Sequence, residues 1–74
     1  MDIAPRIEVD PGRRSGKPVV KGTRVPVSLV LGQLASGMTF EEVGREYEIA
    51  REDILACLAY AAKSLEAEEV RAVR

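Results

Sequence analysis

Few side chains in this sequence have types and spacings that could do chemistry. Glu42 and Glu46 lie four positions apart, so a helix would place both carboxylates on one face, where they could hold a divalent cation or act as an acid and a base. The sequence offers no third ligand beside them. Carboxylates at this spacing are common on solvated helix faces, and we interpret Glu42 and Glu46 in that way.

The chain contains no histidine and a single cysteine, Cys57. The lack of His removes the commonest general base and metal ligand, and one Cys cannot form an internal disulfide. Cys57 lies on the apolar side of a predicted helix, so we interpret it as a small core residue. Gly12, Gly16 and Gly22 do not fit a nucleotide-binding pattern and are better explained by turns. The sequence therefore predicts a protein that is not an enzyme and binds no metal or cofactor.

Basic residues are concentrated in the N-terminal third of the chain. Residues 1–26 contain six basic and three acidic side chains, whereas residues 27–74 contain five basic and nine acidic ones. If the protein binds DNA, this basic segment is the predicted source of phosphate contacts. The candidate phosphate-binding residues are Arg13, Arg14, Lys17, Lys21 and Arg24.

The basic segment is predicted to form a β arm. Residues 6–10 alternate polar and apolar side chains, which is typical of a short strand with one buried face. Residues 18–20 and 24–25 predict two further strands joined by a tight turn, in which Gly22 takes a positive φ. Because Pro18 cannot donate a ladder hydrogen bond, we expect its strand to lie at an edge of the sheet or to begin at Pro18.

Helical spacing of apolar residues begins after Pro26. We expect a first helix over residues 27–36, stopped by a glycine, and a second over residues 40–47. Thr39 and Glu42 have the spacing of a capping box, which marks the start of the second helix.

A third helix is predicted to begin at Arg51, because two carboxylates occupy its first turn, and to extend to about Val70. The predicted fold is mainly α, with a short N-terminal β arm or hairpin over residues 1–26 and a three-helix helix-turn-helix bundle over residues 27–74.

The second and third predicted helices have the lengths of a helix-turn-helix motif. Gly44 falls where a small residue lets the helices approach, whereas Glu48 occupies the turn position that prefers Gly. Apolar residues occur where such a motif needs them to lock the two helices together: Val43, Tyr47, Ile49, Ile54 and Cys57.

The charges of the third helix do not favour DNA binding. Glu52 and Asp53 follow Arg51 directly, and we interpret both carboxylates as a helix start stabilised by the helix dipole. Arg51 is nevertheless the candidate for a contact to base edges. If it makes that contact, its removal should alter sequence preference and not only affinity.

Association with a second copy is expected from the short chain, since a 74-residue domain has a small core. Val19 and Val20 are adjacent and should point to opposite faces of a strand, and Leu55 and Leu58 widen the apolar stripe of the third helix. We expect these four residues to contribute to a homodimer interface.

Four stretches of the sequence resemble the small prokaryotic family DUF433: residues 16–27 (GKPVVKGTRVPV), 34–39 (LASGMT), 51–54 (REDI) and 59–62 (AYAA). The resemblance covers residues 6–65. It implies a short β segment followed by a homeodomain-like helix-turn-helix. It also implies a VapB-like antitoxin encoded beside a PIN-like ribonuclease toxin.

The sequence departs from that family where the third helix begins. Relatives often have Gly at the position of Glu48 and Thr or Ser at that of Ala50. Losing a side-chain N-cap costs about 1 kcal/mol. We expect Glu52 and Asp53 to offset part of this cost.

A nuclease partner with clustered metal-binding carboxylates would be inhibited by a cationic side chain laid into its acidic pocket. We expect residues 63–74 to make this contact through Arg71 and Arg74. Two alternatives stay open: Arg24 of the β arm is the inserting residue, or the segment is a solvated tail in which Arg71 pairs with Glu68.

The sequence has no apolar run long enough to cross a bilayer and no signal peptide, so we expect a cytoplasmic protein that does not bind membranes. Asn is absent and Gln33 is the only Gln, which is typical of thermophile proteins. The predicted function is an antitoxin-like component of a prokaryotic type II toxin–antitoxin system. It would bind a PIN-like nuclease and, in addition, its own promoter DNA. The alternatives are a DNA-binding regulator without a toxin and a structural homodimerisation module.

Overall fold

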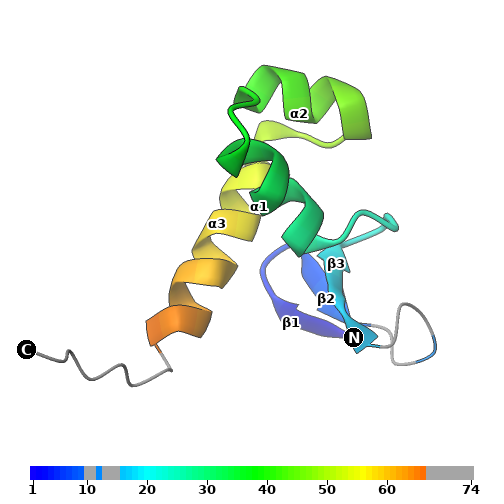
Figure 1. The fold of residues 1–74 in the computed structure, drawn as a ribbon. Coiled ribbons are helices and arrows are strands. Elements are labelled where there is room, and N and C mark those ends of the chain that lie inside the picture. Colours follow the sequence, from blue (N-terminus) through cyan, green and yellow to red (C-terminus); the bar gives the residue numbers. More distant parts are fainter. Residues whose placement is uncertain (10–11, 13–15, 67–74) are drawn as a thin grey trace, which may run out of the picture.

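The computed structural model of the chain describes residues 1–9, 12 and 16–66. Three short strands precede three helices, and their order is β1 (Asp2–Ala4), β2 (Ile7–Val9), β3 (Pro18–Val20), α1 (Val27–Ala35), α2 (Phe40–Tyr47) and α3 (Arg51–Glu66). The sheet lies beside the start of α1, and the far end of α3 runs away from the other elements (Figure 1). The predicted mainly helical fold with an N-terminal β segment is confirmed.

The three strands form one antiparallel sheet in the order β1-β2-β3. β3 is an edge strand, as expected from Pro18. The turn after β3 is also as predicted, because Gly22 has a φ of 79° and the Thr23 amide donates to the Val20 carbonyl at 3.0 Å. The expected strand at residues 24–25 is absent: the chain returns along β3 through an isolated bridge between Val19 and Pro26.

The first hairpin was not predicted. β1 pairs with β2 through a two-residue turn at Pro5 and Arg6, and Arg6 has a φ of 64°. Proline followed by a residue with positive φ is typical of a type II turn, but Gly or Asn is the usual second residue. Arg6 therefore gave no turn signal, and the strand predicted from it begins at Ile7 instead.

The helix boundaries follow from local capping. α1 ends before Gly37, whose φ of 108° lets the chain leave the helix. Thr39 and Glu42 form the predicted capping box of α2, with hydrogen bonds of 3.0 Å and 2.8 Å. α3 begins at Arg51 as expected and is described as far as Glu66. Its predicted extension to Val70 lies outside the described residues.

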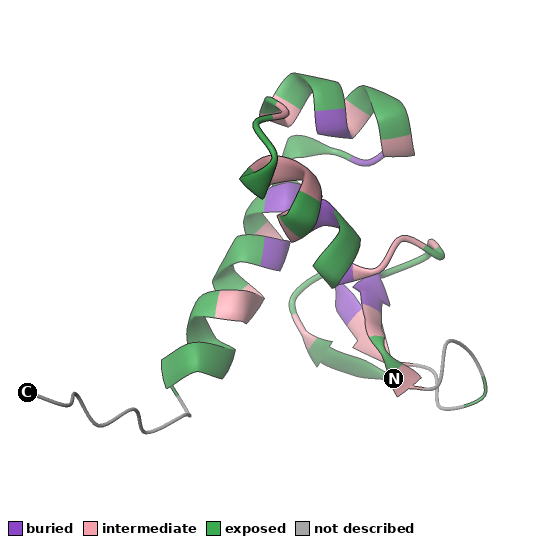
Figure 2. Cartoon of the chain, in the orientation of Figure 1, coloured by how far each residue is buried: buried purple, intermediate pink, exposed green. Residues whose placement is uncertain are grey.

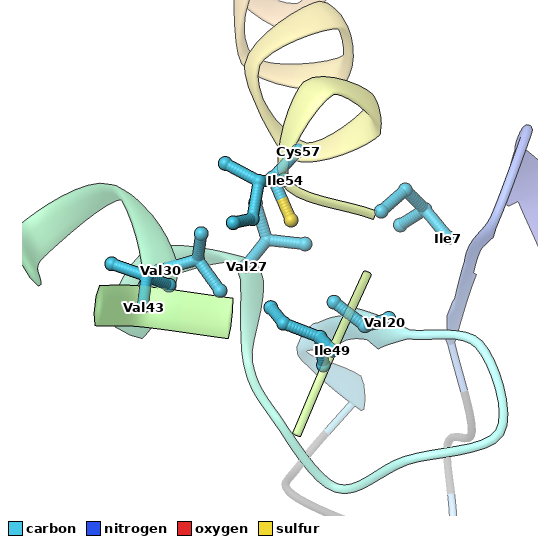
Figure 3. Packing of buried hydrophobic residues seen from close by; sticks show 8 residues of the cluster. All are labelled: Ile7, Val20, Val27, Val30, Val43, Ile49, Ile54 and Cys57. Atoms are coloured by element: carbon cyan, nitrogen blue, oxygen red, sulfur yellow. The ribbon is translucent and has the colours of Figure 1, made fainter. Parts of the chain in front are cut away.

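One apolar cluster joins the sheet to the helices. Figure 2 shows buried residues where the strands face α1 and α3 and where α2 meets both helices, and Figure 3 shows their side chains converging. The strands contribute Ile7 and Val20, which are both fully buried. The cluster consists of Ile7, Val20, Val27, Val30, Val43, Ile49, Ile54 and Cys57. The β arm and the helices are therefore packed on a shared core.

Candidate functional site

The connection between α2 and α3 was singled out by the sequence as a helix-turn-helix. Val43, Ile54 and Cys57 have no exposed surface, and Ile49 in the turn is 8% exposed. Tyr47 is half-buried, and its hydroxyl accepts a hydrogen bond of 2.8 Å from the side-chain Nε2 of Gln33 in α1. The predicted apolar lock between the two helices is confirmed, and we call residues 40–66 the α2–α3 unit.

The turn of the α2–α3 unit is tight. A Cβ atom on Gly44 would lie 3.0 Å from the Ile49 carbonyl oxygen, which confirms that a small residue is needed there. Glu48 ends α2 in the left-handed conformation, with a φ of 55° and a ψ of 47°. This is the turn position that prefers Gly in a helix-turn-helix, because Gly adopts a left-handed conformation without strain.

Asp53 organises the start of α3. Its Oδ2 accepts a hydrogen bond of 2.9 Å from the Ala50 amide, which supplies part of the capping that Ala50 itself lacks. Its Oδ1 accepts a second bond of 2.9 Å from the Arg6 guanidinium, 47 positions earlier in the chain. The sequence predicted that Asp53 offsets part of the missing cap, without naming this hydrogen bond. It missed the contact with Arg6, because nothing local marks a pair so far apart.

The candidate base-contacting residue, Arg51, is exposed at the start of α3. Its guanidinium lies over the Phe40 ring, 4.8 Å from the ring centroid. A cation–π contact of this kind at an exposed site contributes roughly 0.5–1 kcal/mol. Arg51 would have to give up that contact in order to reach into a groove.

The described phosphate-binding candidates of the β arm lie around β3. Lys17 precedes the strand, Lys21 and Arg24 follow it, and all three are exposed. The Lys21 ammonium donates a hydrogen bond of 2.8 Å to the Asp2 carboxylate. This hydrogen bond lowers the pKa of Asp2 and raises the pKa of Lys21. Lys21 is therefore locally neutralised.

The DNA-binding candidates are not shown to form one surface. Lys21 contacts Asp2 of the sheet, whereas Arg51 contacts Phe40 of α2. Two further DNA-binding candidates, Arg13 and Arg14, lie outside the described residues.

The four candidate interface residues fall into two groups. Val19 is 8% exposed and Val20 is fully buried, so both are covered by the chain's own fold and offer no exposed apolar surface. The expectation of a homodimer contact at Val19 and Val20 did not foresee that both side chains are buried within the chain. Leu55 and Leu58 are 45% and 38% exposed on α3, so they remain candidates for an interface.

The side chains that could act as a nucleophile or a metal ligand are buried or take part in other contacts. Burial raises the pKa of the Cys57 thiol to about 11, with a smaller contribution from the Asp53 charge. One oxygen of Glu42 caps α2, and Glu46 lies beside it in a shallow hollow lined by Met38 and Arg45. Among the described residues, no group of three or more His, Cys, Asp or Glu side chains could hold a metal ion. The toxin-binding candidates Arg71 and Arg74 lie outside the described residues.

The described helices include none that is both long and apolar enough to span a membrane. The fold and the α2–α3 unit together define a small three-helix domain with an N-terminal antiparallel sheet. The family model of DUF433, described as a protein of unknown function, matches residues 7–61, and the chain belongs to this family. Neither the curated proteins nor the solved structures contain a match.

Proposed function

We propose that this protein is an antitoxin-type regulator that acts in the cytoplasm by binding another protein and catalyses no reaction. The observation that supports the proposal is the apolar outer side of α3, where Leu55, Leu58 and Leu65 are 45%, 38% and 65% exposed. Side chains on the water-facing side of a helix are usually polar, and contiguous exposed apolar residues typically mark protein-binding surfaces.

The proposed partner is a PIN-like nuclease encoded by the neighbouring reading frame. Its contact would extend from the end of α3 into residues 67–74, where Arg71 and Arg74 could enter an acidic metal site. Arg24, exposed beside β3, is the alternative inserting residue.

The experiment is co-expression of the full chain with the nuclease encoded next to it, followed by purification of the complex and an assay of ribonuclease activity. We expect a stable complex with the nuclease inhibited. A chain truncated after Ala67 should bind but inhibit poorly. Full inhibition by the truncated chain would exclude the tail and favour Arg24, and a nuclease that neither binds nor loses activity would overturn the proposal.

DNA binding is the second candidate, supported by the short turn that joins α2 to α3, which is typical of a helix-turn-helix, and by the exposed Arg51 at the start of α3. Charge reversal at Arg13, Arg14 and Lys21 should then weaken binding uniformly, because phosphate contacts carry no base information, whereas Arg51→Ala should change sequence preference. Electrophoretic mobility shifts with the protein's own promoter at several salt concentrations measure both effects. No binding at low salt would remove this role.

A further inference from the structure

Four apolar residues form a continuous stripe along the exposed side of α3. Leu55, Leu58, Ala62 and Leu65 are separated by three, four and three positions, which places them on one side of a helix. The three leucines are 45%, 38% and 65% exposed, and Ala62 is also exposed. We call these four residues the α3 seam.

The second half of the seam lies on a part of α3 that projects from the fold. Residues 62–66 are all exposed, and Figure 2 shows the last turns of α3 extending away from the sheet and from α2. Helical turns without tertiary packing gain little stability in water, because most helix stability in proteins comes from an apolar face that is covered. A second helix laid along the seam would supply that packing.

We propose that the α3 seam binds the α3 seam of a second copy of this chain, with the two helices antiparallel. This rests on the proposed function: the exposed apolar side of α3 pairs two copies of the antitoxin, and the nuclease then contacts the dimer through residues 67–74 or through Arg24. Spacing of three, four and three is the a and d pattern by which two helices interdigitate along a shared stripe. A surface related to itself by a twofold axis must be self-complementary, and a seam that pairs with its own copy meets that requirement.

The sizes of the seam residues select the orientation. In one antiparallel register all four residues find partners: each Leu58 lies opposite Ala62 of the second copy, and each Leu55 opposite Leu65. A parallel pair would place Ala62 opposite Ala62 and leave a gap between two small side chains, which loses contacts. Large residues facing small ones fill the space evenly, so the seam favours the antiparallel arrangement. Opposed helix dipoles favour it as well.

The size of the chain supports a second copy as the occupant. Domains of about this length are usually stabilised by disulfides, by a metal or by association. Cys57 is the single cysteine and is buried in the core, so no disulfide is available within the chain. Pairing along α3 would enlarge the apolar core without any further component.

The first experiment is sedimentation velocity of the full chain at several micromolar concentrations. We expect a dimer, and we expect Leu58→Glu to weaken it about 100-fold or more. Leu29→Glu is the matched control, because Leu29 is 37% exposed on α1, outside the seam, whereas Leu58 is 38% exposed. Circular dichroism verifies that both variants fold. If Leu58→Glu does not fold, Ala62→Glu replaces it as the seam variant. A monomeric wild type, or equal weakening by Leu29→Glu, would overturn the proposal.

The second experiment tests the orientation by disulfide trapping. In the antiparallel register, Leu58→Cys mixed with Ala62→Cys should give a mixed disulfide identifiable by mass, whereas Ala62→Cys alone should cross-link poorly. Cys57 should not compete, because it is fully buried and its pKa is raised to about 11. Efficient cross-linking of Ala62→Cys alone would show a parallel pair and would overturn the antiparallel arrangement.

These experiments separate the dimer from the proposed function. A chain that is monomeric alone but still binds and inhibits the nuclease would refute the seam pairing and leave the antitoxin role intact. A chain that dimerises through the seam but neither binds nor inhibits the nuclease would support the pairing and refute the role.

Discussion

The α2–α3 unit and the N-terminal sheet are held in place by different kinds of contact. In the α2–α3 unit, side chains cap both helix starts and fully buried residues such as Val43 and Ile54 fill the space between the helices. In the sheet, strands of three residues are joined by exposed polar contacts, including Lys21 to Asp2 and the Gly22 amide to Glu8 at 2.9 Å. The helical unit is thus specified by neighbouring residues, whereas the sheet depends on the helices to cover its one apolar side.

The largest effects should come from truncating the same side chain in each region. Ile54 and Ile7 are both fully buried in the shared core, so Ile54→Ala and Ile7→Ala should each cost about 2–5 kcal/mol of unfolding free energy. We expect Ile54→Ala to unfold the whole chain and Ile7→Ala to release the sheet while the helices persist. Thermal melts followed by circular dichroism, together with amide NMR signals from the strands, measure this difference. Simultaneous loss of both signals in both variants would show that the two regions fold as one unit.

The close approach within the α2–α3 unit can be tested by adding a side chain. Gly44→Val should cost about 1–3 kcal/mol, because its Cβ would lie 3.0 Å from the Ile49 carbonyl oxygen. Gly32→Val is the matched control: Gly32 lies within α1, and a Cβ there meets nothing within 4 Å. Urea unfolding should show that only Gly44→Val is strongly destabilising, and equal midpoints for the two variants would contradict the tight turn.

The capping contacts allow a comparison between threonines. Thr39→Ala removes the side-chain cap of α2 and should cost about 0.5–2 kcal/mol. Thr23 makes two comparable hydrogen bonds in the turn after β3, to the Val20 carbonyl and from the Val25 amide. We expect Thr23→Ala to lower the thermal midpoint less, since that turn lies outside the helical unit. A larger loss for Thr23→Ala would reverse the ranking of the two regions.

The smallest effect concerns the exposed pair of Asp2 and Lys21. Because the pKa of Asp2 is lowered by folding, its contribution to stability is present above the usual carboxyl value and is lost as the pH falls below about 4. The pKa of Lys21 is raised, so its contribution is lost only as the pH rises above about 10. Lys21→Ala should return the Asp2 pKa toward its ordinary value in an NMR titration, and an unchanged pKa would show that the pair does not form in solution.

Features that depend on neighbouring residues could be predicted from the sequence. The start of α2 follows from the spacing of Thr39 and Glu42, and the turn after β3 follows from Gly22. The need for a small residue at Gly44 was also foreseen, because helix-turn-helix motifs restrict that position.

Features that depend on distant residues were missed or wrong. β1 carries no alternation that marks a strand, and Arg6 adopts a left-handed turn conformation for which Arg is not a usual choice. The contact of Arg6 with Asp53 joins residues 47 positions apart. The burial of Val20 depends on a cluster that includes Val27 and Val30 of α1, which a strand pattern cannot reveal. The seam on α3 was anticipated in part, through Leu55 and Leu58.

The rate at which Cys57 reacts with a thiol reagent can report local opening of the core. It is the single thiol of the chain, its side chain is fully covered, and its pKa is raised to about 11, so a thiol reagent reaches a reactive thiolate only when the packing around α3 opens. The rate of labelling therefore counts opening events without any engineered probe. A molecule that binds along α3 should slow the labelling of Cys57. Comparing labelling rates would therefore rank how strongly each partner suppresses opening of the core.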